Sequence, residues 1–98
     1  MYTLVDAKAR DNELEGKFNT PTWQEIKDLS VGEWVKLIFE TDDERFEAER
    51  MWVKVTNIGF VFEGILDNDP AILTHMKPGD PITFTGKHII DIHKGLTQ

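Results

Sequence analysis

The sequence contains no cysteine, which excludes a disulfide framework, a thiolate zinc site and a cysteine nucleophile. Its one serine, Ser30, lies at the end of an expected helix and lacks the glycine pattern of a nucleophile elbow. The glycine-rich motifs that cradle phosphate or bind dinucleotides are also missing. The densest group of carboxylates lies in a polar segment, where solvent keeps an acid and a base from being tuned for catalysis. We therefore expect a protein that is not an enzyme.

Long hydrophobic runs and an excess of positive charge are missing as well. No apolar stretch approaches the roughly 20 residues that span a bilayer, and the N-terminal sequence lacks the basic and apolar regions of a signal peptide. We therefore expect a cytoplasmic protein that does not bind membranes. The formal net charge is −7, which disfavours non-specific binding to nucleic acid because phosphate contacts depend on Lys and Arg. An acidic surface suits a basic protein partner instead.

The length and composition predict one domain over residues 1–98, with 40% hydrophobic and 30% charged residues. Residues 1–16 show weak periodicity, and we expect a peripheral N-terminal segment that is either loop or frayed helix. A capping-box pattern, Thr22 with Glu25 three residues later, predicts a short helix from Trp23 to Leu29.

Much of the remaining chain alternates between apolar and polar residues, as β-strands do. Turn residues separate these runs. Two of the turns end in Gly32-Glu33 and Gly79-Asp80 and lead into similar strand sequences. Shared turn chemistry explains this likeness without an internal duplication. The last candidate, KHIIDIH, fits either a fifth strand or a helical turn. The expected strands cover residues 32–40, 49–56, 60–66, 81–84 and, in the first of these alternatives, 87–93. A glycine inside the third strand, Gly64, predicts a bulge or a close approach by another backbone.

Several segments together resemble a known family. The stretches GEWVKLIFE, ERMWVKV, EGILDNDP, KPGDPITF and KHIIDI, in this order, are similar to the YegJ-like family of small bacterial and phage domains of unknown function. The likeness covers roughly residues 17–92. Its most specific part is MWV followed by G-x-L-x-N-x-P, present here as Gly64, Leu66, Asn68 and Pro70.

The resemblance implies a fold and a kind of activity. The implied fold is a compact α+β unit with a curved antiparallel sheet. With the strands and helix that the residue patterns predict, we expect a single compact domain with a barrel-like sheet of four to five strands and one short N-terminal helix. The family's position beside toxin or defence genes implies binding and neutralising rather than catalysis.

The stretch ERMWVKV suggests a binding face. Arg50, Trp52 and Lys54 share one side of the second strand, and Lys36 joins them if the first two strands pair antiparallel. An aromatic plane flanked by cations suits a flat anionic ligand such as a nucleotide. The alternative is structural, with Trp52 packed beneath other elements and the charged side chains lying over it.

The segment LDNDP and the histidines supply the other candidate ligand contacts. Asn68 and Asp69 could meet a ligand, or they could satisfy backbone amides within a turn. His88, which the resemblance includes, could contact a ligand or serve as a structural hydrogen-bond partner. The spacing of His75, His88 and His93 does not suit a shared metal ion. We therefore expect no metal and no cofactor.

Two functions are compatible with these features. The first is a small non-enzymatic protein that captures an anionic, nucleotide-derived ligand, acting as a sponge in bacterial or phage defence or counter-defence. A homo-oligomer of this kind could use exposed apolar residues such as Ile38 and Phe46. The second is an acidic inhibitor or immunity protein that blocks a toxin or defence enzyme. It would use residues 40–49, which hold six acidic residues and one arginine and are expected to form a solvated loop.

Overall fold

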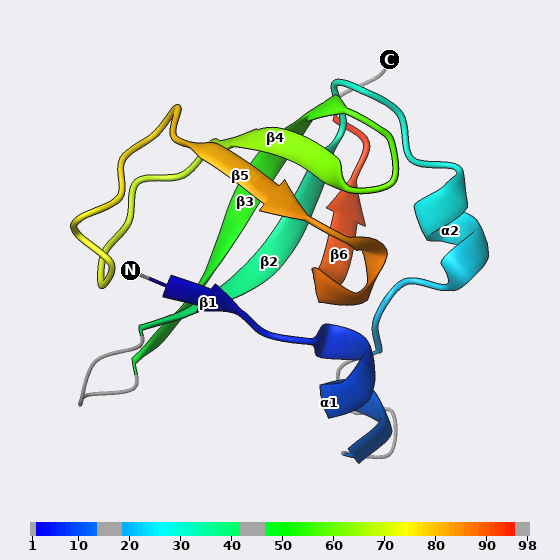
Figure 1. Cartoon of the computed structure of the whole chain (residues 1–98), viewed down its shortest axis with the longest axis horizontal. Helices are drawn as coiled ribbons and strands as arrows, with labels where there is room; N and C mark the ends of the chain where they lie inside the picture. The colour runs from blue at the N-terminus through cyan, green and yellow to red at the C-terminus, as the bar shows by residue number, and fades with distance from the viewer. Residues whose placement is uncertain (1, 14–18, 42–46, 96–98) are drawn as a thin grey trace.

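The computed structural model describes residues 2–13, 19–41 and 47–95, and the chain folds around one curled antiparallel sheet (Figure 1). The elements in chain order are β1 (Tyr2–Leu4), α1 (Ala7–Glu13), α2 (Trp23–Lys27), β2 (Trp34–Thr41), β3 (Ala48–Asn57), β4 (Phe62–Leu66), β5 (Pro81–Phe84), the 3₁₀ helix η1 (Gly86–His88) and β6 (Ile89–His93).

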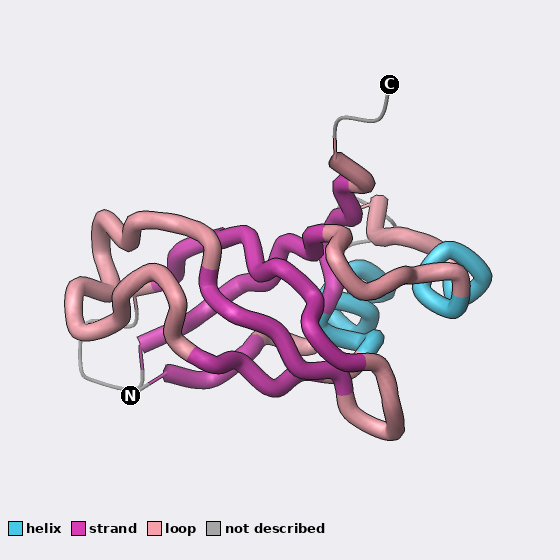
Figure 2. The backbone as a smooth tube through the Cα atoms, turned by 90° about the horizontal axis from the view of Figure 1, so that it is seen from above, coloured by secondary structure: helices cyan, strands magenta, loops and turns pink. Residues whose placement is uncertain are grey.

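The sheet has the order β1-β2-β3-β4-β5, and β6 also pairs with β2. β1 and β6 therefore share one edge of β2. Leu4 lies opposite Phe39 in the second half of β2, whereas Ile89 lies opposite Leu37 in the first half. Seen from above, the strands curl into a half-barrel (Figure 2).

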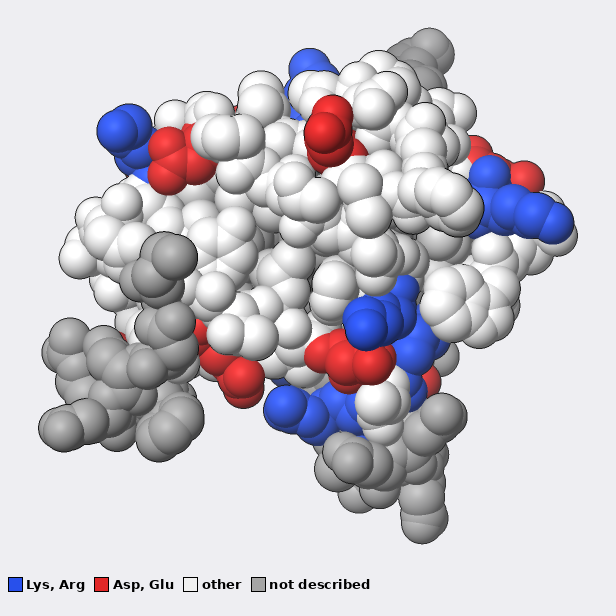
Figure 3. Space-filling model, in the orientation of Figure 1, with Lys and Arg blue, Asp and Glu red and all other residues white. Residues whose placement is uncertain are grey.

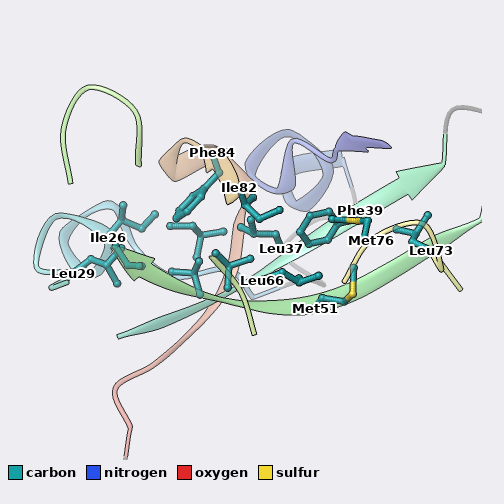
Figure 4. Packing of buried hydrophobic residues seen from close by; sticks show 14 residues of the cluster. Ile26, Leu29, Leu37, Phe39, Met51, Leu66, Leu73, Met76, Ile82 and Phe84 are labelled. Carbon is teal, nitrogen blue, oxygen red and sulfur yellow. The ribbon is translucent and has the colours of Figure 1, made fainter. Parts of the chain in front are cut away.

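The core fills the inside of this curl, because alternate residues of each strand point inward. Phe39, Leu37, Met51 and Phe84 are among the largest side chains that are fully buried. Ile26 and Leu29 add to the core from α2 and the turn that follows it, and Leu73 and Met76 do so from the segment between β4 and β5 (Figure 4).

The capping box that the sequence predicts is present at the start of α2. Thr22 Oγ1 accepts a hydrogen bond from Glu25 N at 3.1 Å, and Glu25 Oε1 accepts one from Thr22 N at 2.8 Å. The helix ends at Lys27 rather than Leu29, with Asp28 as its C-cap. Leu29 lies beyond the helix and is still buried.

The two similar turns are built in the same way. Glu33 Oε1 accepts a hydrogen bond from Ser30 N at 2.9 Å, and Asp80 Oδ2 accepts one from Lys77 N at 3.0 Å. The glycine before each acidic residue has a positive φ, 96° in the first turn and 94° in the second, which glycine adopts at low cost. Common turn chemistry thus explains the sequence likeness of the two segments.

Gly64 lies where two strands approach closely, as the sequence predicts. A β-carbon at this position would come within 2.5 Å of Lys54 O and 2.6 Å of a methyl carbon of Val53. β3 runs beside the glycine as the paired neighbour of β4, and the position has no room for a side chain.

The α+β class and the curved antiparallel sheet are as expected, but the number of elements is larger. The sheet has six strands rather than four to five, and the described residues form two α-helices rather than one. β1 has three residues, too few to show a period of two. For the segment KHIIDIH we expected either a strand or a helical turn, and the structure contains both, since the helical turn η1 leads directly into the strand β6. The N-terminal segment, which we expected to be peripheral, contributes β1 and two buried side chains, Val5 and Ala7.

Ile38 does not form the exposed oligomer surface that the sequence suggested. Its side chain is only 6% exposed, and its carbonyl oxygen accepts a hydrogen bond from Val5 N. The N-terminal segment therefore follows β2 at this point, which the strand pattern alone does not reveal. Phe46, the other residue suggested for an oligomer interface, lies outside the described residues.

Candidate functional site

The pairing of β2 with β3 brings aromatic and cationic side chains together on the outer face of the sheet, opposite the core. Lys36 lies opposite Trp52, and Trp34 lies opposite Lys54. Lys36 Nζ is 4.8 Å from the centre of the Trp52 ring, and Lys54 Nζ is 5.4 Å from the centre of the Trp34 ring. Each indole thus has an ammonium group over its face, an attractive arrangement for the ring quadrupole.

A histidine from the far end of the chain joins the two indoles. β6 places His93 opposite Trp34, and the imidazole centre is 5.8 Å from the centres of both the Trp34 and Trp52 rings. We call Trp34, Trp52 and His93 the outer-face aromatic cluster. Together with Asp67 these residues line a cleft of about 160 Å³.

Two contacts hold the Trp34 indole in place. Asp67 Oδ2 accepts a hydrogen bond from Trp34 Nε1 at 2.7 Å. Gly95 approaches the six-membered ring so closely that a β-carbon there would be 2.7 Å from a carbon of the indole. A preorganised aromatic ring loses little conformational freedom when a ligand binds.

The segment after β4 completes the edge of β3 beside the cleft. Asn68 Oδ1 accepts a hydrogen bond from Trp52 N at 2.9 Å, and Trp52 O accepts one from Asp67 N at 3.0 Å. The side-chain oxygen of Asn68 therefore satisfies a backbone amide, as in the structural alternative for LDNDP, but this amide belongs to β3 and not to the turn itself. Asp69 follows in the same segment and is exposed, but it does not line the cleft.

The structure brings together only some of the predicted ligand residues. Lys36, Trp52 and Lys54 form one surface. Arg50 lies farther along the same face, opposite Ile38 in the sheet and outside the cleft lining. His88 lies in η1, which contacts α1, and it does not line the cleft.

His88 has a structural contact of its own. Its Nδ1 accepts a hydrogen bond from Thr85 N at 3.0 Å, which requires that nitrogen to be unprotonated. Burial lowers the pKa of His88 below its ordinary 6.5, Lys87 lowers it further, and Asp6 acts in the opposite direction. As the pH falls, the unfolded chain therefore takes up this proton before the folded chain does.

We expect protonation of His88 to destabilise the fold at mildly acidic pH. The stabilising effect of the neutral ring is complete above the ordinary pKa and is lost as the pH falls toward the lowered pKa. Between about pH 7.5 and about pH 5.5, His88→Asn should lose less thermal stability than the unmodified protein, because an amide oxygen accepts the Thr85 hydrogen bond without titrating. Thermal unfolding monitored by circular dichroism at both pH values measures this. Equal losses in the two proteins would contradict the assignment.

Part of the acidic segment 40–49 is engaged by the fold. Glu40 forms an ion pair with Arg10 at 3.8 Å, and the Glu49 carboxylate accepts hydrogen bonds from three successive backbone amides of residues 71–73. These two carboxylates are not simply exposed charges. Residues 42–46, which belong to the same segment expected to bind a protein partner, lie outside the described residues.

Two kinds of feature are missing from the described part of the chain. Among residues 2–13, 19–41 and 47–95, no three His, Cys, Asp or Glu side chains are grouped so that they could hold a metal ion. No helix within the same ranges is long and apolar enough to cross a membrane.

The comparison with protein families places the chain in a group of bacterial proteins. A family model described as "Uncharacterized protein conserved in bacteria (DUF2314)" matches residues 4–94. The chain belongs to the DUF2314 family. No curated protein and no solved structure matches the chain. The DUF2314 match includes most of the N-terminal segment that the resemblance left out. Its description names bacteria but no phage, activity or YegJ-like group, so those parts of the resemblance stay predictions.

Sequence reasoning missed three contributors to the site in this DUF2314 domain. Trp34 has the same strand parity as Lys36, so the alternation puts it on the outer face, but it was not predicted to belong to the site. His93 and Asp67 carry no such signal, because each reaches the cleft through the pairing of segments far apart in the sequence.

Proposed function

We propose that this DUF2314 domain is a non-enzymatic binding domain whose outer-face aromatic cluster takes a planar anionic ligand of the nucleotide class. The observation that carries the proposal is the pairing of each indole with an ammonium group, at 4.8 Å and 5.4 Å, beside a cleft. A base or other flat ring stacks on aromatic side chains, and phosphate oxygens accept hydrogen bonds from Lys36 and Lys54.

The size of the cleft limits how much of a ligand it can enclose. Its volume of about 160 Å³ is below the roughly 300–1,000 Å³ of sites that bury most of a drug-sized ligand. We therefore propose that one ring enters the cleft while the anionic groups stay at the surface beside the lysines. Lys54 is exposed and Lys36 is partly exposed, so both side chains can meet an anionic group at the surface.

The same contacts limit the affinity. Stacking of one base contributes about 1–3 kcal/mol, and each hydrogen bond to a charged group contributes about 1.5–3 kcal/mol. One stacked ring and two such bonds correspond at best to about micromolar binding. A sponge that competes for a scarce signal needs tighter binding, which would require further contacts such as those from a second copy of the chain.

We expect isothermal titration to show binding of ADP-ribose or a cyclic dinucleotide, and much weaker binding of uncharged adenosine. Trp52→Ala should weaken binding about tenfold through lost stacking. The double variant Lys36→Gln, Lys54→Gln should weaken it at least as much and reduce its dependence on salt. Lys77→Gln serves as a matched control, because this exposed lysine lies in a turn away from the cluster.

The titration has a clear negative outcome. If no nucleotide of the panel binds at about millimolar concentration, or if Lys77→Gln weakens binding as much as the double variant, the proposed ligand class is wrong. Circular dichroism of each variant confirms that the fold is retained.

A further inference from the structure

A second and larger hollow lies away from the outer-face aromatic cluster, between α2 and the loop that joins β3 to β4. It has a volume of about 470 Å³ and shares no residue with the first cleft. Figure 1 shows α2 beside this loop. We call it the α2 groove, and its lining residues are Trp23, Gln24, Ile26, Lys27, Ile58, Phe62 and Gly86.

Large apolar side chains around the α2 groove are exposed to solvent. Phe60, at the tip of the loop, is fully exposed, and Trp23 is 60% exposed. Ile58 and Val61 in the same loop are also exposed. Exposed apolar residues that gather in one place, rather than singly, indicate an interaction surface. Trp and other aromatic residues are the side chains that most often anchor a protein interface.

The lining of the α2 groove holds a cation and no carboxylate, although the net charge of the chain is negative. Lys27 is the charged residue of the lining, and Lys87 directly follows the lining residue Gly86. The carboxylates on α2 are engaged locally, since Glu25 accepts from the Thr22 amide and Asp28 accepts from the Gln24 side chain. In Figure 3, largely uncharged atoms cover the area over β4 and β5, and both basic and acidic side chains lie toward α2.

These observations favour a polypeptide over a small molecule as the occupant. A small molecule that fills the groove would leave Phe60 and Val61 uncovered, because neither residue is part of the lining. A peptide that crosses the groove can place one apolar side chain inside and cover the loop tip with the next. Its charged residues would have to be acidic to suit Lys27 and Lys87.

We propose that the α2 groove binds an acidic amphipathic segment of a partner protein. The apolar side chains of the segment enter the groove and pack on Phe60, and its carboxylates meet Lys27 and Lys87. The proposal is independent of the nucleotide site, because the two surfaces have no residue in common.

The test uses the full chain and two fluorescein-labelled synthetic peptides. Both peptides carry Leu and Phe on one helical face; the first carries Glu on the opposite face and the second carries Lys. Fluorescence anisotropy should show binding of the Glu peptide and weaker binding of the Lys peptide. Phe60→Ser should weaken binding of the Glu peptide about fivefold or more, the usual effect of removing an anchoring side chain. Lys27→Glu should weaken binding of the Glu peptide and strengthen binding of the Lys peptide.

A control variant tests whether the effect on peptide binding is specific to the α2 groove. Ile72→Ser removes another exposed apolar side chain, 43% exposed, from a distant segment and should leave binding unchanged. Both Phe60 and Lys27 are exposed, so their variants should fold, which thermal unfolding checks. The proposal is overturned if neither peptide binds, if both bind equally, or if Phe60→Ser has no effect. It is also overturned if the protein alone sediments as a dimer that Phe60→Ser converts to monomer, because the groove would then hold a second copy.

Discussion

Replacing Gly64 with alanine is expected to lower the free energy of unfolding by about 3 kcal/mol. The added methyl carbon would lie 2.5 Å from Lys54 O and 2.6 Å from a side-chain carbon of Val53. The carbonyl oxygen belongs to the neighbouring strand, so it can move only if the pairing of β3 with β4 is distorted. The expected cost is therefore at the upper end of the range for overpacking in a well-packed interior. Urea unfolding followed by tryptophan fluorescence measures it.

Gly59→Ala provides the matched control for this substitution. A β-carbon at Gly59 would make one ordinary contact, with Val61 O at 3.6 Å, and this glycine does not have a positive φ. We expect its free energy of unfolding to change by less than about 0.5 kcal/mol. If Gly64→Ala were as stable as Gly59→Ala, the close approach of β3 to Gly64 would be wrong.

Replacing Glu49 with alanine is expected to lower the free energy of unfolding by about 2 kcal/mol. Glu49 Oε2 accepts from Ala71 N at 2.7 Å, and Oε1 accepts from the next two amides, those of Ile72 and Leu73, at 2.9 Å and 3.0 Å. Without the carboxylate these three backbone amides lose their partner. Glu49→Gln should cost about half as much, because its single carbonyl oxygen can keep two of the bonds. Chemical unfolding of the three proteins at neutral pH tests this order.

The effect of Glu49 should depend on pH. Burial raises the pKa of Glu49, but the three backbone amides outweigh burial and lower the pKa below its ordinary 4.5. The unfolded chain therefore takes up the proton first as the pH falls, so the stabilisation is present above the ordinary pKa and is lost as the pH falls through the lowered one. We expect the difference between the unmodified protein and Glu49→Gln to shrink below about pH 4. If the difference in unfolding free energy between the two proteins stayed constant down to about pH 3, the charge of the Glu49 carboxylate would not contribute to stability.

The local sequence predicts the features that depend on neighbouring residues. The alternation in β3 puts Trp52 and Lys54 on one face, and antiparallel pairing adds Lys36, as the register of the two strands confirms. The capping box of α2 and the turn before β5 depend on residues three apart, and the structure contains both. A short-range pattern is sufficient for the capping box and the turn because each contact is made within one turn of the chain, whereas the shared face of Lys36 and Trp52 also needs antiparallel pairing of β2 with β3.

Features that depend on the order of the strands could not be predicted in this way. His93 reaches the outer face because β6 pairs with the first half of β2, a contact between segments about 60 residues apart. The spacing of His93 from the other histidines argues only against a metal and contains no information about the two indoles. Ile38 shows the reverse case, since its strand position suggests exposure whereas the residue is buried and its carbonyl oxygen accepts a hydrogen bond from the N-terminal segment.

The division of one edge of β2 between β1 and β6 has a consequence for truncated versions of the protein. Residues 2–4 and 89–93 each cover their own half of this edge, and neither can replace the other. Removing either segment would leave unpaired N–H and C=O groups along a strand rich in hydrophobic residues. Such a strand is a template for pairing with other chains. Short deletions at either end should therefore cause aggregation rather than simple fraying.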